Sequence, residues 1–158
     1  MTQNKKLGLI VNPVAGLGGR VGLKGSDGVA IQKRALALGA VPRASQRASQ
    51  ALASIAPQAD GATRSCIELA LFTPPGKMGA DAARACGFAP IVIGTIQPGQ
   101  TTPQDTRDAA REMLARDVDL LLFAGGDGTA RDIYHAVDER LPVLGIPAGC
   151  KMHSGVYA

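Results

Sequence analysis

Apolar residues gather in five short runs along the chain, and stretches with helical spacing separate them. The runs cover residues 7–11, 67–72, 91–93, 120–123 and 142–146. The fourth run, 120–123, is apolar without alternation, which is typical of a strand covered on both faces in a parallel sheet. We therefore expect an α/β fold of three layers, in which a doubly wound, mostly parallel sheet lies between helices.

Between the runs, apolar residues recur at the i, i+3 and i+4 positions of amphipathic helices. This spacing predicts helices near residues 31–38, 44–55, 82–86, 102–114 and 130–137, and the start of a further helix after Pro147. The fourth of them opens with an N-cap, a proline and an acid, Thr102-Pro103-Gln104-Asp105. The apolar face predicted for the fifth consists of Ala130, Ile133, Tyr134 and Val137.

The fourth run ends in a glycine-rich turn, Gly125-Gly126-Asp127-Gly128-Thr129, and helical spacing begins directly after it. A strand, a tight turn and a helix N-terminus bring unpaired backbone N–H groups to one point, with the helix dipole behind them. Such a point attracts phosphate, and glycines let a ligand approach the main chain closely. We expect Gly125, Gly126, Gly128 and Thr129 to hold phosphate oxygens; Thr129 could also cap the helix.

Asp127 is the one acid within this turn. A carboxylate repels phosphate, so a magnesium-linked role or a role as general base would explain it beside an anion site. The alternative is an ordinary turn in which Asp127 only caps the following helix. The ligands of any metal ion are not defined by the sequence.

A second glycine-rich loop follows the first run at residues 12–19, starting with Asn12. It lacks the Gly-x-x-x-x-Gly-Lys-Ser/Thr order of a P-loop, and a flexible linker is its alternative reading. In a parallel sheet the loops after all strands share one edge, where ligands bind. These loops begin at Asn12, Thr73, Gly94, Gly125 and Pro147, and Lys151 after the last of them is a candidate for countering negative charge, or an ordinary surface lysine.

The turn Gly125–Thr129 resembles the signature of NAD kinases and of the diacylglycerol and sphingosine lipid kinases, with a near relative in phosphofructokinases. Three further segments are similar to one branch, the ATP-NAD-kinase-like proteins encoded with acetoin catabolism. They are residues 9–19, residues 121–132 around the turn, and residues 145–154. The resemblance runs from near residue 7 to the C-terminus.

This resemblance implies a kinase that transfers a phosphoryl group from ATP, or from polyphosphate, to a hydroxyl, with the ribose 2′-OH of NAD as first candidate. Mg²⁺ would bridge the phosphates and Asp127 would accept the hydroxyl proton. A lipid-kinase-like phosphotransferase, or a regulatory module linked to acetoin catabolism that binds nucleotide or phosphate without turnover, are the alternatives. Family members carry a second, mostly β domain that completes the acceptor site. We therefore expect residues 1–158 to form a single nucleotide-binding domain that lacks the second one, associates into homo-oligomers and does not turn over NAD alone.

Composition narrows the class of ligand. Hydrophobic residues make up 46% of the 158 residues and charged residues 19%, which argues against disorder. The net charge is +4, but Lys and Arg are scattered and aromatic residues reach only 3%, which favours small anionic ligands over nucleic acid. The apolar runs are too short for a signal peptide or a membrane span, and three unclustered cysteines, Cys66, Cys86 and Cys150, suggest a reducing cytoplasm.

Overall fold

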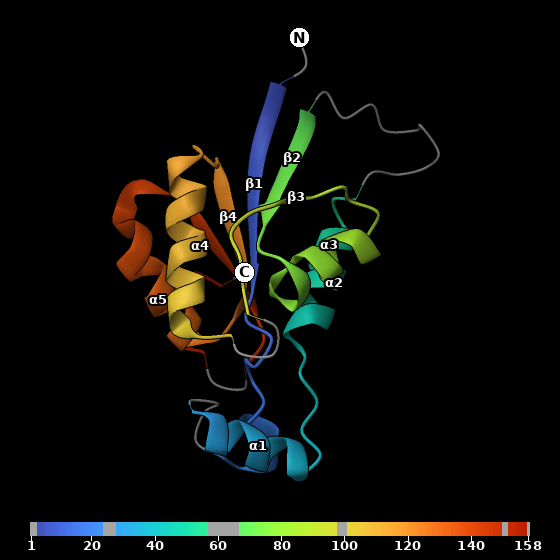
Figure 1. Ribbon diagram of the computed structural model, residues 1–158, viewed down its shortest axis with the longest axis vertical. Helices are drawn as coiled ribbons and strands as arrows, with labels where there is room; N and C mark the ends of the chain where they lie inside the picture. Colours follow the sequence, from blue (N-terminus) through green and yellow to red (C-terminus); the bar gives the residue numbers. More distant parts are fainter. Residues whose placement is uncertain (1–2, 24–27, 57–66, 98–100, 150–151, 158) are drawn as a thin grey trace.

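The computed structural model describes residues 3–23, 28–56, 67–97, 101–149 and 152–157 (Figure 1). The strands of this part of the chain form one five-stranded sheet in the order β3-β2-β1-β4-β5, and every pairing is parallel. Their bounds are β1 (Gln3–Val11), β2 (Ile67–Thr73), β3 (Ile91–Val92), β4 (Leu120–Gly125) and β5 (Val143–Pro147). Each of the five apolar runs is thus a strand, as predicted.

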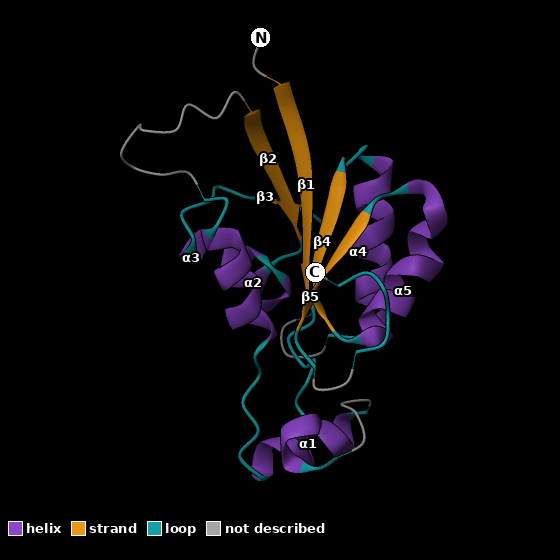
Figure 2. Cartoon of the chain, turned by 180° about the vertical axis from the view of Figure 1, so that it is seen from behind, coloured by secondary structure: helices purple, strands orange, loops and turns teal. Residues whose placement is uncertain are grey.

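Helices cover both faces of the sheet. The described helices are α1 (Val29–Ala37), α2 (Ala44–Ala53), α3 (Ala80–Ala85), α4 (Pro103–Ala115) and α5 (Asp127–Val137), with short 3-10 turns η1 (Gly19–Val21), η2 (Gly76–Met78) and η3 (Asp138–Arg140). Helices α4 and α5 lie on one side and α2 and α3 on the other (Figures 1 and 2). The predicted three-layer α/β fold is therefore confirmed.

Strand β4 lies inside the sheet and is buried on both faces. Leu121 and Phe123 point into the core cluster under α4 and α5. Leu122 and Ala124 point into the cluster on the side of α2 and α3. A strand packed between two apolar layers has no solvent face to occupy with polar residues, which explains the absence of alternation in its sequence.

The direction of winding reverses between β1 and β4. From β1 the chain builds β2 and β3 toward one edge, and β4 and β5 then add on the other side of β1. The connections that leave β1 and β4 consequently run to opposite faces and open a crevice at their carboxyl ends. Residues 12–16 and the glycine turn both border this crevice.

Helix α4 begins as its sequence predicts. The Thr102 hydroxyl oxygen accepts from the backbone N–H of Asp105 at 3.3 Å, and the Asp105 carboxylate accepts from the backbone N–H of Thr102 at 2.7 Å. Pro103 is the first helical residue, where no N–H is needed. This capping box closes the N-terminus of α4 with groups of its own chain.

Helix α1 exists where the spacing predicts it, but it covers neither face of the sheet. It lies beyond the carboxyl ends of the strands (Figure 1). Ala35 is its buried residue, while Val29 and Leu36 are 67% and 52% exposed, so the helix lacks an apolar face wide enough to pack on a sheet. It packs instead in a small cluster with Leu17 and Ala40.

The further helix predicted after Pro147 is wrong for the residues that the structure describes. Residues 152–157 form a turn that returns to β5, where the backbone N–H of Gly145 donates to the Val156 carbonyl at 2.7 Å. Tyr157 forms a β-bridge with Gly145, and its ring packs against that of Phe123 in a tilted arrangement with centroids 5.7 Å apart. A Cβ on Gly145 would lie 2.5 Å from the Tyr157 ring, so this return path requires glycine there.

The inward face of α5 also differs from the predicted one. Tyr134 is 56% exposed, whereas Thr129, Ile133, Ala136 and Val137 are buried. Thr129 and Ala136 therefore lie on the inward face in place of Tyr134. The sequence pattern missed this because a tyrosine ring counts as strongly apolar, whereas a threonine and an alanine do not.

No helix among the described residues has the length and apolar character to cross a bilayer.

Candidate functional site

A cavity of about 780 Å³ occupies the crevice at the carboxyl ends of β1 and β4. Segments far apart in the sequence line it: the loop after β1, α1, the N-termini of α4 and α5, and the loop after β5. The lining residues include Asn12, Gly16, Gln32, Thr101, Thr102, Thr106, Gly126, Asp127, Gly128, Thr129, Asp132 and Gly149. Loops after several strands meet at this cavity, as expected, but of the five loop positions named from the sequence only Asn12 lines it, whereas Thr73, Gly94, Gly125 and Pro147 do not.

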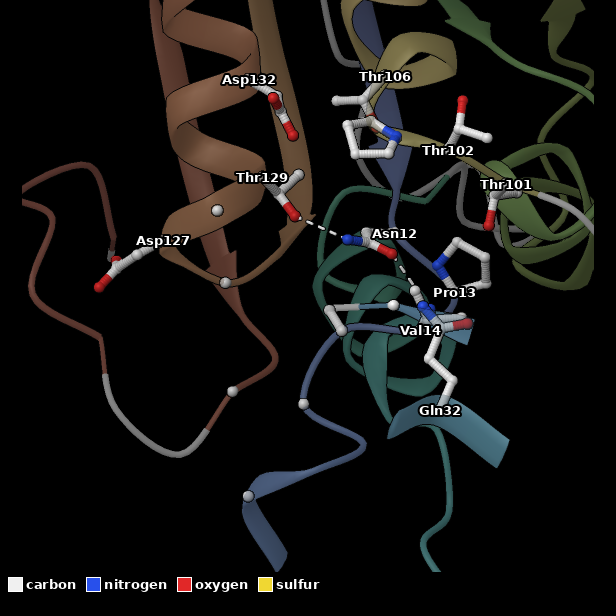
Figure 3. Close-up of a pocket in the computed structure, with 18 of the residues that line it drawn as sticks. Asn12, Pro13, Val14, Gln32, Thr101, Thr102, Thr106, Asp127, Thr129 and Asp132 are labelled. Atoms are coloured by element: carbon white, nitrogen blue, oxygen red, sulfur yellow. Dashed lines mark hydrogen bonds between the residues drawn. The ribbon is translucent and has the colours of Figure 1, made fainter. Parts of the chain in front are cut away.

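Asn12 joins the two glycine-rich loops. Its side-chain amide donates to the Thr129 hydroxyl oxygen at 2.9 Å, and its Oδ1 accepts from the backbone N–H of Val14 at 3.2 Å (Figure 3). The backbone N–H of Asn12 donates to the Ala124 carbonyl at 2.9 Å, which continues the β1–β4 pairing into the loop. Two candidates separated by 117 positions in the sequence are therefore in direct contact.

Thr129 does not cap helix α5. The N-cap is Gly126, which makes no side-chain capping bond, and Thr129 lies inside the first turn with only 4% of its surface exposed. The alternative in which Asp127 caps its own helix is also wrong, because the Asp127 carboxylate accepts from the backbone N–H groups of His153 and Ser154.

The first turn of α5 is consequently open to a ligand. Its first backbone bond runs from the Ala130 N–H to the Gly126 carbonyl at 3.1 Å, so the three amides before Ala130 have no acceptor within the helix. A Cβ built on Gly126 or Gly128 would meet no atom within 4 Å. Glycine inside a helix costs about 1 kcal/mol relative to alanine. Because no neighbouring atom would meet a side chain at Gly128, packing does not explain this glycine. The free space beside these residues is where a phosphate can reach the amides.

Gly125 and Lys151 stand apart from the other candidates. Gly125 is the last residue of β4, and a Cβ there would lie 2.6 Å from the Thr129 hydroxyl oxygen, so its glycine makes room for Thr129. It is not among the residues that line the cavity. Lys151 lies outside the described residues.

Of the cysteines, Cys86 is a free thiol that donates to the Ser49 carbonyl at 3.3 Å, while Cys66 and Cys150 lie outside the described residues.

The Asp127 carboxylate points toward residues 152–157 and away from Asn12 and Thr129 (Figure 3). Its Oδ2 accepts from the His153 N–H at 2.8 Å and its Oδ1 from the Ser154 N–H at 3.2 Å. The hydrogen bond from the His153 backbone, followed by that from Ser154, lowers the pKa of Asp127 because both bonds favour the ionised form. In this position Asp127 is a weaker base than an ordinary aspartate.

Tyr157 borders the same carboxylate. Its hydroxyl oxygen is buried and has no hydrogen-bond partner in the described part of the chain. Burial and the nearby negative charge of Asp127 raise the pKa of Tyr157 to about 12, because both disfavour the phenolate. Residues 152–157 thus bond to Asp127 through two backbone amides, and the buried phenol of Tyr157 lies close enough to be affected by its charge.

We expect the contact between Asp127 and residues 152–157 to weaken in acid. The folded-state pKa of Asp127 lies below its ordinary value of 3.8, so the contact stabilises the fold above pH 3.8 and is lost as pH falls through the lowered pKa. An NMR titration of the His153 and Ser154 amide shifts should show a common step with a midpoint below 3.8. The step should vanish in Asp127→Asn; a midpoint at or above the ordinary value would contradict the arrangement.

The sequence pattern missed a group of polar residues on the α4 side of the cavity. Arg107 donates to Oδ1 of Asp132 through Nε at 3.0 Å and Nη2 at 2.8 Å, which joins α4 to α5. Thr101, Thr102 and Thr106 line the cavity nearby. One signal was present: Asp132 is three residues after Thr129 and so on the same helical face.

The comparison with protein families agrees with the geometry. Residues 7–158 match the model of the ATP-NAD kinase N-terminal domain. The chain belongs to this family. No curated protein matches the chain. Membership makes it a kinase-like phosphotransferase domain, and the ATP-NAD kinase family works with ATP, a divalent metal ion and NAD.

The cavity lining contains carboxylates that bear on the divalent metal ion used by the family. No cluster of three or more His, Cys, Asp or Glu side chains that could hold a metal ion is present among the described residues. Mg²⁺ commonly needs only one or two carboxylates together with substrate phosphates and water. Asp127 and Asp132 are the carboxylates among the residues that line the cavity. Asp132 is paired with Arg107, so a contact to the metal ion would fall to Asp127 once its carboxylate leaves the His153 and Ser154 amides.

Proposed function

We propose that this ATP-NAD kinase domain takes part in transferring the terminal phosphoryl group of ATP, or of polyphosphate, to the ribose 2′-OH of NAD. The observation that carries the proposal is the open first turn of α5 at the switch point of the sheet, where Gly126 and Gly128 leave free space that packing does not require. Backbone amides at a helix N-terminus bind phosphate. Family membership supplies the reaction class.

In the proposed reaction the acceptor hydroxyl oxygen forms a bond to the terminal phosphorus, and the bond from that phosphorus to the bridging oxygen breaks. The leaving phosphate takes the electron pair, and the hydroxyl proton passes to the Asp127 carboxylate. The amides of Gly128 and Thr129 stabilise the charge on the phosphoryl oxygens. Bound Mg²⁺ supplies further charge neutralisation, and Lys151 remains a candidate for the same task.

Asp127 must change position to act in this way. Its carboxylate has to leave the His153 and Ser154 amides and turn into the cavity, which restores the pKa that those hydrogen bonds lower. This requirement also supports the second candidate function, a module that binds nucleotide without turnover. Formation of phosphorylated NAD favours the kinase, and tight nucleotide binding without product favours the module.

We expect Asn12→Asp to weaken ATP binding at least about tenfold while the fold is retained. Aspartate has the shape of asparagine, still accepts from the Val14 N–H, and can accept from the Thr129 hydroxyl in place of donating to it. The new charge lies beside the phosphate-binding amides, and a like charge at such distances costs on the order of 1–4 kcal/mol. Calorimetric titration with ATP measures the change.

Asn4→Asp is the matched control, because Asn4 is an exposed residue at the opposite end of the same strand, β1. It should bind ATP as the wild-type chain does. Unchanged ATP affinity in Asn12→Asp would remove the loop after β1 from the phosphate site and contradict the proposal.

A further inference from the structure

The two helices whose N-termini reach the cavity differ in what they can bind. The first turn of α5 is open, as described above. At α4 the capping box occupies the N-terminus: Pro103 has no N–H, the Asp105 N–H is bonded to Thr102, and the Asp105 carboxylate adds negative charge. A phosphate therefore finds free amides at α5 and a closed, acidic turn at α4.

The α4 side offers hydrogen-bond acceptors in place of amides. Both hydrogen bonds from Arg107 end on Oδ1 of Asp132, so Oδ2 receives no hydrogen bond from any described residue. The Asp132 side chain is only 18% exposed and lines the cavity. Figure 3 shows it on the side of α5 that faces Thr106. This carboxylate is fixed in place, with one oxygen left for a ligand.

Thr106, in helix α4, lies opposite Asp132 (Figure 3). It is 4% exposed, lines the cavity, and its hydroxyl makes no hydrogen bond to another residue of the described ranges. A threonine hydroxyl that borders a cavity can donate a hydrogen bond to a ligand and accept one from it. A ligand with hydroxyl groups fits this pair of residues: one hydroxyl can donate to the Asp132 carboxylate, and the Thr106 hydroxyl can donate to the ligand or accept from it.

The Arg107 guanidinium also balances the negative charge of Asp132 on the α4 side of the cavity. Paired with Arg107 at 2.8 Å, Asp132 carries no net excess of negative charge that would expel a nucleotide whose phosphates lie at α5. A carboxylate that binds Mg²⁺ directly has its charge balanced by the metal ion and does not need an arginine beside it. The arginine clamp therefore favours recognition of a neutral hydroxyl over a direct metal contact.

We infer that Asp132, positioned by Arg107, is the residue of this cavity that binds ribose hydroxyl groups, so that a nucleotide lies with its phosphates on α5 and its sugar between α5 and α4. The inference rests on the proposed function, since it assigns the sugar end of the same nucleotide site. It names a binding residue outside the Gly125–Thr129 turn.

The test compares ligands that differ only in the sugar. The 158-residue chain is titrated calorimetrically, in EDTA, with ADP, with 2′,3′-dideoxy-ADP and with pyrophosphate. The wild-type chain should bind ADP about tenfold more tightly than the dideoxy compound, the size of one hydrogen bond to a charged acceptor. In Asp132→Ala this ratio should fall to near one, while pyrophosphate binds as tightly as before or more tightly because Arg107 has lost its partner.

Two further variants sharpen the comparison. Asp108→Ala removes an exposed carboxylate that is paired with Arg111 at 3.0 Å on the same helix, α4, and should leave the ratio unchanged. Arg107→Ala should lower the ratio, as expected of a positioning residue. Pyrophosphate should bind somewhat more weakly to this variant because the charge of Asp132 is no longer balanced, and Arg107→Ala/Asp132→Ala should restore its affinity. If Asp132→Ala does not fold, the double variant Arg107→Ala/Asp132→Ala, which leaves no unpaired guanidinium, takes its place.

The outcomes separate the inference from the proposed function. A ratio near one in the wild-type chain, a ratio that survives in Asp132→Ala, or a ratio that appears only when Mg²⁺ replaces EDTA would each overturn the role of Asp132 and leave phosphate binding at α5 intact. Failure of both ADP and pyrophosphate to bind the wild-type chain would overturn the proposed function together with the inference.

Discussion

Replacing Asp127 by asparagine should lower the rate of phosphoryl transfer about 100-fold or more in any form of the protein that makes phosphorylated NAD. Asparagine has nearly the same shape but cannot take the hydroxyl proton and carries no charge for a metal ion. One amide oxygen still accepts from His153 or Ser154, so the segment 152–157 keeps part of its contact. ATP affinity should change little, because the α5 amides are untouched.

Steady-state measurement of kcat for NADP formation, together with ATP titration, separates the two effects. Asp81→Asn is the matched control: Asp81 is likewise an acid in the first turn of a helix, α3, but is exposed and does not line the cavity. It should retain the full rate. An Asp127→Asn enzyme with wild-type kcat would show that proton transfer and metal binding occur elsewhere.

Gly16→Ala should destabilise the fold by about 3 kcal/mol and abolish nucleotide binding. Gly16 has φ +75°, a left-handed conformation that costs other residues roughly 1–2 kcal/mol. A Cβ there would also overlap the Ala148 carbonyl oxygen and lie 3.0 Å from its carbon, and these are backbone atoms that cannot rotate away. The loop after β1 would have to separate from the loop after β5, which would pull the cavity walls apart.

Gly22→Ala is the control that isolates the contact. Gly22 has almost the same φ, +76°, but a Cβ there meets no atom within 4 Å. It should lose only the backbone term, roughly 1–2 kcal/mol. Chemical denaturation gives both free energies of unfolding; equal losses in the two variants would show that Gly16 and Ala148 do not approach each other closely.

The sequence alone determined the features that depend on neighbours along the chain. The apolar run of β4 predicted a strand buried on both faces because its side chains carry that information one by one. The capping box of α4 and the open glycine turn before α5 are likewise local, since their partners lie within four residues. The parallel order of strand and helix then implied that the strand-end loops share one edge.

The tertiary structure decided everything that depends on partners distant in sequence. The Asn12–Thr129 and Arg107–Asp132 contacts join residues 117 and 25 positions apart. The placement of α1 beyond the sheet, and the return of residues 152–157 along β5, follow from which surfaces remain uncovered after the other elements pack. Periodicity records whether a residue is buried, but not which residue lies against it, and the orientation of the Asp127 carboxylate depends on that second fact.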